Sequence, residues 1–480
     1  MTDVPFPMTN QPGAVPGEGL GRLLNRFAEL DGQIQQWRLV PGLAAFTDVL
    51  VAGPRGMHDF NGLLYDARQN VAATVTANGA VAAVPGTLNG TKPVSWAHNN
   101  KSPSNDLIVV SQEAGALYVD PTTGVHPYSG YDGGALPASV NSCAMLDGYF
   151  LFTDSSGKVW ASGVNSIFVN GVDTTQNPLA YGIADMSGGL VRGTVWAEQY
   201  FAWGQRACTV YVNAATSPFP LSRTAIIPVG LLTFGAITGF EPHWGLQQFF
   251  VADDHTVRRL DGYTPTVISV NDLERLIQAV VDPTQIEMFC YVTGARPTVV
   301  VKGPTFCWEF NALTGNWNER QSPNLSTWRA SKSIAFNGQW YCGDTQSTQL
   351  LRISLTEYDE LGTSFTARME SGAVKNYPNR GRCLSLFVDF TTGQAPSSGN
   401  PDAVNPMVSI SASVDGGATW TAPVLRRSIG PQGDYREIVR VNRLGGVFSQ
   451  HGIRFRVDSS SPVYSTCRGA RCNVLWLAPA

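Results

Sequence analysis

The sequence predicts an all-β protein, a β-propeller of six or seven blades with an additional antiparallel β domain. Short apolar bursts recur seven times between Asn61 and Leu355, in units that open 42 to 51 residues apart. Strand-built repeats of about 40 to 50 residues are the signature of a propeller. The composition agrees, because 49 glycines, 30 prolines and 10% aromatic residues suit many strands joined by tight turns.

Each repeat combines an apolar burst with a polar turn and a second strand. A blade cannot cover both of its faces alone, so its inner strands are expected to be unbroken apolar runs between neighbouring blades. The alternative is a series of hairpins in one or two β-sandwiches, but sandwich strands recur about every 8 to 12 residues without the longer period. The bursts are Leu63–Tyr65, Leu107–Val110, Tyr149–Phe152, Tyr200–Trp203, Phe249–Ala252, Val299–Val301 and Trp340–Cys342.

Charge separates the chain into parts. From Phe365 onward, 13 Lys and Arg face 7 Asp and Glu, a net +6; the remaining 364 residues carry 20 against 30, a net −10. We therefore expect an N-terminal arm over residues 1–60 that packs with the C-terminal domain, a propeller over 61–360, and an antiparallel β domain over 365–480.

The sequence offers no cluster typical of a catalytic, metal or cofactor site. Eight cysteines occur without a Cys-x-x-Cys pair, and six histidines are scattered without ligand spacing. We expect reduced thiols, no metal and no cofactor. The chain starts without a signal-peptide pattern and contains no apolar run of about 18 residues, so synthesis and assembly in a cytoplasm are expected.

The N-terminal part carries a family resemblance. The spacing of Leu20, Leu23, Leu24, Phe27 and Leu30 favours an amphipathic helix. However, LLNRFAE followed by WRLVPGLAAF resembles the opening of the tail hub proteins of short-tailed bacteriophages, also called nozzle or packaged-DNA stabilisation proteins. The resemblance implies an extended segment, and we favour that reading. The matching positions are Asn25, Glu29, Pro41 and Gly42.

The resemblance continues discontinuously over about two thirds of the chain. It includes residues 194–223, residues 333–354 and the closing strands from Leu444 to Val463. It also includes a helix predicted from Asn271, with Glu274 in capping-box position and Pro283 as the stop. The apolar face of this helix indicates core packing, since it holds no cluster of chemical groups.

One motif of the C-terminal part is shared with an enzyme family. The segment fits the Asp-box of sialidase-type propellers, in which Asp and Ser side chains bond the backbone of a hairpin turn above a Trp. This box is a structural turn that does not touch substrate. A sialidase would also need several boxes, an arginine cluster, and a Glu with a Tyr nucleophile, so we expect no enzyme. The box residues are Ser413, Asp415, Gly417 and Trp420.

Arginines dominate the charge of the C-terminal domain. They are candidates to contact phosphate of DNA in a channel, or acids of a neighbouring subunit or an adaptor protein; we favour the protein contact. Neither case requires base-specific readout. The candidates are Arg426, Arg427, Arg436, Arg440, Arg443, Arg454 and Arg456, with Arg468 and Arg471 further along.

The resemblance implies a structural virion protein of the phage tail. In that family, six copies form a ring below the portal and its adaptor, continue the DNA channel and keep the packaged genome from leaking. It further implies contacts with tail fibre or spike proteins, with tail needle or tip proteins, and with DNA without sequence specificity. A carbohydrate- or protein-binding propeller, such as a receptor-binding protein, is the alternative, and a sialidase-like hydrolase is a weaker one.

Overall fold

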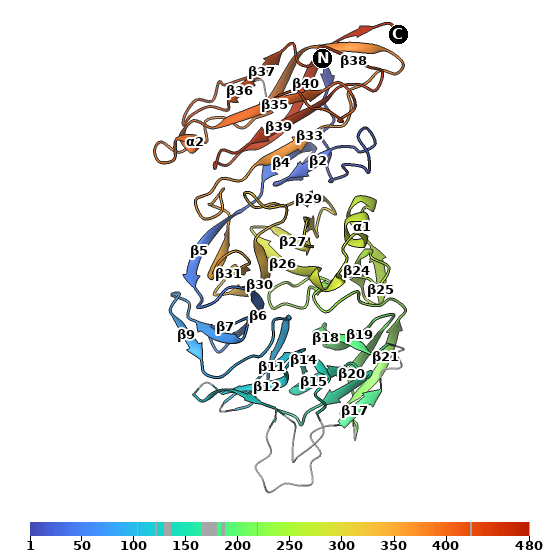
Figure 1. Cartoon of the computed structure of the whole chain (residues 1–480), viewed down its shortest axis with the longest axis vertical. Coiled ribbons are helices and arrows are strands. Elements are labelled where there is room, and N and C mark those ends of the chain that lie inside the picture. The colour runs from blue at the N-terminus through green and yellow to red at the C-terminus, as the bar shows by residue number, and fades with distance from the viewer. Residues whose placement is uncertain are drawn as a thin grey trace.

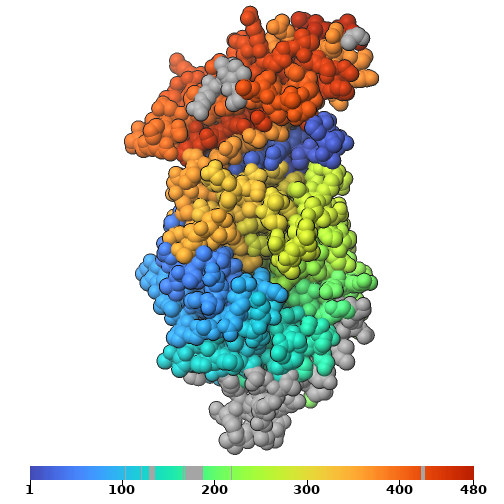
Figure 2. Space-filling view, in the orientation of Figure 1, coloured from blue at the N-terminus to red at the C-terminus, as the bar shows by residue number. Residues whose placement is uncertain are grey.

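The structure is a computed structural model of the chain. It describes all residues except 103, 121, 129–135, 166, 168–179, 184–187, 218, 423–424 and 480, and it leaves out the side chains of 180–183, 425 and 426. The described residues form two bodies stacked along the long axis, a propeller and a C-terminal β domain, with N-terminal strands between them (Figures 1 and 2). Both chain termini lie in the C-terminal body.

Seven four-stranded units make the propeller. Six are separate sheets and the seventh belongs to a larger sheet. In chain order, the first five are β6 (Pro54–Phe60), β7 (Leu63–Arg68), β8 (Val71–Val75) and β9 (Val81–Val84); β10 (Val94–His98), β11 (Leu107–Ser111), β12 (Gly115–Asp120) and β13 (Gly124–Pro127); β14 (Val140–Leu146), β15 (Tyr149–Asp154), β16 (Lys158–Ala161) and β17 (Ala180–Ile183); β18 (Leu190–Trp196), β19 (Gln199–Gly204), β20 (Cys208–Asn213) and β21 (Leu221–Ile227); and β22 (Ile237–Thr238), β23 (Phe249–Val251), β24 (Val257–Asp261) and β25 (Thr264–Val267).

The last two units close the ring. One contains β26 (Glu287–Thr293), β27 (Arg296–Lys302), β28 (Cys307–Asn311) and β29 (Trp317–Glu319), and the other contains β30 (Ala330–Phe336), β31 (Gln339–Asp344), β32 (Gln349–Ser354) and β5 (Gly42–Asp48). Strand β5 comes from the N-terminal part and pairs antiparallel with β32. The propeller therefore starts at Gly42, 19 residues before the expected start at Asn61, because the ring needs an early strand to complete its last blade.

The predicted bursts lie in the middle of the blades. Each lies in the second strand of its blade, except that Ala252 directly follows the end of β23. Leu107–Val110, Phe150–Phe152 and Phe249–Ala252 have no more than 1% of their surface exposed. Each burst is covered on both faces by adjacent blades; for example, the Trp203 and Phe250 rings of neighbouring blades lie 4.6 Å apart. This two-sided burial explains why the runs are apolar without alternation.

A continuous sheet joins the propeller to the C-terminal domain. Strand β2 (Arg22–Leu24) pairs in parallel with β29 of the propeller and antiparallel with β33 (Ala367–Glu370). From β33 the sheet continues through β39 (Arg454–Ser459) and β35 (Met407–Ser413) to β36 (Leu425–Ser428). A nine-stranded sheet thus crosses the junction, with β2 as its central link.

The second sheet of the C-terminal domain has seven strands and includes the rest of the N-terminal segment. Its order is β3 (Arg26–Asp31), β4 (Ile34–Leu39), β40 (Thr466–Leu477), β34 (Arg380–Phe390) and β37 (Val439–Asn442), with β1 (Thr2–Asp3) beside β40 and β38 (Val447–Phe448) beside β34. A core that includes Leu386, Ile410, Val441 and Phe455 fills the space between the two sheets. Short helix α2 (Pro401–Val404) precedes β35.

Two local expectations are decided by these elements. The segment with helical spacing at residues 20–30 forms strands β2 and β3, so the extended reading is confirmed and the helix is wrong; pairing with β33 and β4 outweighs the spacing. The predicted helix is present as α1 (Asn271–Gln278), but Val270 takes the N-cap position and Asn271 does not cap. A one-turn 3₁₀ helix, η1 (Pro283–Gln285), follows. Among the described residues, no helix has the length and apolar character to cross a membrane.

Candidate functional site

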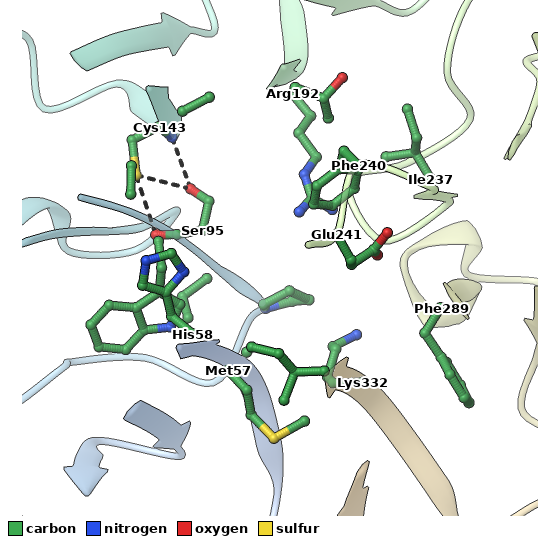
Figure 3. A pocket seen from close by; sticks show the side chains of 18 of the residues that line it. Met57, His58, Ser95, Cys143, Arg192, Ile237, Phe240, Glu241, Phe289 and Lys332 are labelled. Carbon is green, nitrogen blue, oxygen red and sulfur yellow. Dashed lines mark hydrogen bonds between the residues drawn. The ribbon is translucent and has the colours of Figure 1, made fainter. Parts of the chain in front are cut away.

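The first strands of all seven blades surround a cavity of about 260 Å³ at the centre of the propeller (Figure 3). Four of these strands, β6, β14, β18 and β30, carry a β-bulge near their start. A bulge inserts one residue into the pairing and redirects neighbouring side chains. Three cationic residues lie at such bulges and line the cavity: Arg55 at the β6 bulge, Arg192 beside the β18 bulge, and Lys332 at the β30 bulge with a φ of 52°.

The titratable groups on the other side of the cavity are neutral at pH 7. His58 Nε2 and His98 Nδ1 are 2.8 Å apart and share a hydrogen bond. Burial, followed by the proximity of His98, lowers the pKa of His58 to about 3. Burial raises the pKa of the Cys143 thiol to about 12. The described residues contain no group of three His, Cys, Asp or Glu side chains arranged to hold a metal ion.

The N-terminal motif residues lie where the propeller meets the C-terminal domain. Asn25 has a φ of 53° and 1% of its surface exposed, and its Nδ2 donates to Gln321 O and Thr366 O, both at 2.9 Å. Its Oδ1 accepts from Gln321 N at 3.0 Å. One side chain therefore ties the end of a propeller blade to the start of the C-terminal domain.

The other three motif residues have different surroundings. Pro41 O accepts a 2.6 Å hydrogen bond from Arg320 at the junction, and Gly42 N donates to Glu357 O at 2.7 Å. A Cβ on Gly42 would lie 2.4 Å from Asp359 O, so only glycine fits there. Glu29 instead lies in the outer hairpin β3–β4, where it forms an ion pair with Arg38 at 3.2 Å.

A buried charge network underlies this junction, and sequence reasoning did not find it. Arg320, Glu309 and Glu360 have no exposed surface; Arg320 lies 3.4 Å from Glu360 and 3.9 Å from Glu309. Glu309 also accepts from Tyr291 and lies 3.5 Å from Arg296, whose guanidinium stacks 3.7 Å from the Phe27 ring centre. The network draws on several strands, so no local sequence pattern marks it.

The C-terminal arginines divide into two groups. Arg454 and Arg456 are neighbours on one face of β39 and are engaged within the chain: Arg454 donates to Gly19 O at 2.9 Å, and Arg456 lies 3.7 Å from Asp458 and 3.8 Å from Glu370. The other group lies on or next to the edge strands β36 and β37, where Arg427 Nε donates to Arg440 O at 2.9 Å. The backbone of Arg426 is in β36, and its side chain lies outside the described residues.

We call the second group the basic edge, defined by Arg427, Tyr435, Arg436, Ile438, Arg440 and Arg443. Arg436, Arg440 and Arg443 are exposed, and Arg440 stacks on the Phe387 ring at 5.0 Å. Tyr435 and Ile438 are each 69% exposed. Exposed apolar and aromatic side chains therefore lie next to the arginines in this segment.

The Asp-box residues form a hydrogen-bonded turn. Ser413 Oγ donates to Asp415 Oδ1 at 2.7 Å and accepts from Gly417 N at 2.7 Å, while Asp415 accepts from Thr419 N at 3.0 Å. These hydrogen bonds, mainly those from Thr419, lower the pKa of the Asp415 carboxyl. Arg456 stacks on the Trp420 ring at 4.8 Å. Every one of these contacts stabilises the turn or its strand.

The fold and this arrangement define a β-propeller protein with a second β domain locked to it. The family model described as "Bacteriophage P22 Gp10, beta-propeller" matches residues 23–357, which are 335 of the 480 residues. The chain belongs to this phage stabilisation family. It is a structural β-propeller protein of a bacteriophage, as the resemblance in its N-terminal motif predicted.

Individual solved structures resemble the chain only weakly. No curated protein sequence matches the chain. The structure of U3-55K has a TM-score of 0.42 at 10% identity and covers 66% of this chain and all of its own. The designed protein Ika8 has a TM-score of 0.38 at 9% identity and covers 64% of this chain and 99% of its own. The WD40 β-propeller domain of Doa1 has a TM-score of 0.38 at 10% identity and covers 65% of this chain and 96% of its own.

Proposed function

We propose that this protein is a subunit of a ring in the phage tail. The ring, of six copies as in the resembling family, docks below the portal and its adaptor, continues and closes the DNA channel, and retains the packaged genome. The observation that carries the proposal is the family match over residues 23–357. The propeller forms the outer wall and carries the contacts with fibre, spike or needle proteins.

The basic edge is the proposed contact surface for a neighbouring subunit or the adaptor. Its exposed Tyr435 and Ile438 lie beside arginines, and Tyr and Arg are the residues that protein interfaces favour. Phosphate recognition alone requires cations and leaves the exposed Ile438 without a role. This composition supports a protein contact over a DNA contact for this segment.

The junction supports a mechanical role. A subunit that holds back DNA must transmit force from its channel side to its docking side without bending. The nine-stranded sheet and the Asn25 hydrogen bonds cross from the propeller to the C-terminal domain. Two guanidinium groups of the buried charge network cross as well, because Arg296 stacks on Phe27 and Arg320 on Phe365. These contacts favour movement of the two bodies as one unit.

The experiment is electron microscopy of the purified protein mixed with its portal and adaptor, together with DNA retention by particles that lack it. We expect a sixfold ring on the portal channel and leakage of DNA from the deficient particles. Free monomers beside an undecorated portal, together with full DNA retention, would contradict the proposal.

Charge reversal locates the docking surface. The triple variant Arg436→Glu, Arg440→Glu and Arg443→Glu is expected to abolish docking. A matched control places the same charge change on exposed propeller positions, Lys92→Glu, Arg206→Glu and Arg275→Glu, and is expected to dock normally. Loss of docking in the control but not in the first variant would assign the contact to the propeller.

A further inference from the structure

The central cavity contains a cation, Arg192, that has no carboxylate at contact distance; the Glu241 carboxylate, which lines the same cavity, acts on it from farther away. Arg192 forms no ion pair within 4.0 Å among the described residues; its Nη1 donates to Phe234 O at 2.9 Å and its buried Nε has no acceptor. The guanidinium is held between the Phe234 and Phe240 rings, at 4.4 and 4.6 Å from their centres. Figure 3 shows Arg192 and Phe240 side by side at the cavity.

A second donor without an acceptor belongs to another residue that lines the cavity. The indole Nε1 of Trp96, on β10, is buried and has no acceptor. Its ring is stacked parallel to that of His58, with centres 6.4 Å apart, which restricts where the N–H points. A buried N–H without an acceptor costs about 1 to 3 kcal/mol, so two of them beside one cavity indicate an absent acceptor.

The other charged groups around the cavity are already engaged. The Lys332 ammonium lies 2.5 Å from Glu287, which also faces Lys302 at 3.6 Å. The Arg55 guanidinium donates to three carbonyl oxygens and to Ser111 Oγ, and lies 4.0 Å from Glu113. Glu241 accepts from Thr238 Oγ1 and Gly239 N at 2.8 and 2.6 Å. Two lysines share Glu287, so the surroundings hold an excess of positive charge.

We propose that the central cavity binds a small free oxyanion, a carboxylate or a phosphate, on the Arg192 guanidinium and the Trp96 indole N–H. The oxygens accept from both donors, which belong to different blades, and the anion gives Arg192 the contact partner that it lacks within 4.0 Å. The volume of about 260 Å³ accommodates such an anion, since one water needs only about 10 to 15 Å³ of such space. Bound in this way, the anion links blades across the central cavity and stabilises the closed ring of blades.

The test uses the full-length protein with inorganic phosphate, and in a separate arm with succinate, against sodium chloride at matched ionic strength. We expect a saturable heat of binding and a rise in melting temperature with the preferred anion, which ligand linkage requires. The arm that gives the tighter binding identifies phosphate or carboxylate. Saturable binding of neither anion would mean that water alone fills the cavity, and would overturn the proposal.

Two variants and one control locate the site. Arg192→Met is expected to weaken binding by at least about tenfold through loss of a charge-assisted hydrogen bond. Trp96→Phe keeps an aromatic ring, although a smaller one, and removes the N–H. It remains informative if Arg192→Met fails to fold, and we expect about fivefold weaker binding. Arg258→Met removes a cation that pairs with Asp254 at 2.5 Å outside the cavity, and should leave binding unchanged. Unaltered affinity in Trp96→Phe and Arg192→Met would refute the assignment.

Discussion

Replacing Arg320 by Met tests whether the buried charge network holds the two bodies together. The Met side chain fills similar space but leaves Glu360 without its ion-pair partner, because Arg320 is the only cation within 4.0 Å of Glu360 among the described residues. It also removes the 2.6 Å hydrogen bond to Pro41 O. Glu309 is less affected, since Arg296, Tyr291 and Asn318 still contact it.

The expected loss follows from the burial of both partners. Neither Arg320 nor Glu360 has exposed surface, and breaking a buried ion pair costs about 3 to 5 kcal/mol because one charge is left uncompensated. Because about 1.4 kcal/mol changes an equilibrium constant tenfold, the open state of the junction should be populated about 100 to 4,000 times more. The control Arg259→Met breaks a pair with Asp261 in which both side chains are 34% exposed, and should cost less than about 1 kcal/mol.

Hydrogen exchange of strands β2, β29 and β33 is the assay, because it reports opening of the junction separately from unfolding of either body. Burial already raises the pKa of Glu360, and loss of Arg320 should raise it further. Protonation then stabilises the folded variant, so the defect should be largest at high pH and shrink as the pH falls through this raised pKa.

The double variant Arg320→Met with Glu360→Gln removes the uncompensated charge and should recover much of the protection at pH 7. The reasoning would be refuted if Arg320→Met lost less than about 1 kcal/mol of junction stability. It would also be refuted if the double variant were no more protected than the single one.

Three further changes probe other parts of the structure. Asn25→Ala removes the side-chain hydrogen bonds of a residue at positive φ and should lower junction stability by about 2 to 4 kcal/mol, measured by the same exchange. Gly42→Ala brings a Cβ within 2.4 Å of Asp359 O and should cost at least about 2 kcal/mol of propeller stability, measured by urea unfolding. Gly338→Ala is the comparison, because Gly338 has a positive φ but a Cβ there would meet no other atom within 4 Å. Lys332 and neighbouring donors outweigh burial and lower the pKa of Glu287 to about 2. The carboxylate therefore stabilises the fold above pH 4.5, and this stabilisation is lost as the pH falls through about 2. Glu287→Gln should flatten the acid part of the curve of stability against pH, and an unchanged acid part would contradict this.

Local pattern was sufficient to predict the repeat and several of its details. The apolar bursts mark the middle of blades because burial on both faces leaves no polar face to encode. The Ser413 to Trp420 turn was predictable because its hydrogen bonds join residues close in sequence. Helix α1 was predictable because its apolar residues, including the buried Leu273 and Ile277, recur with helical spacing. The N-terminal motif identified the family, and its Asn25 lies at the junction.

Other features arise from contacts between distant segments, and the sequence does not display them. Strand β5 completes a blade whose other strands begin nearly 300 residues later, and β2 inserts between two domains. The helical spacing at residues 20–30 was misleading because strand pairing with partners far along the chain outweighs local periodicity.

The sequence by itself determined the fold class, the number of apolar repeats and the basic character of the C-terminal part, since each is a property of composition or of spacing along the chain. Only the tertiary structure decided which arginines are engaged within the chain and which are exposed, and which donors face the central cavity. Arg192, Arg320 and Arg440 are alike as letters in the sequence. Their surroundings, a cavity, a buried ion network and an exposed edge, are set by strands that meet only when the chain has folded.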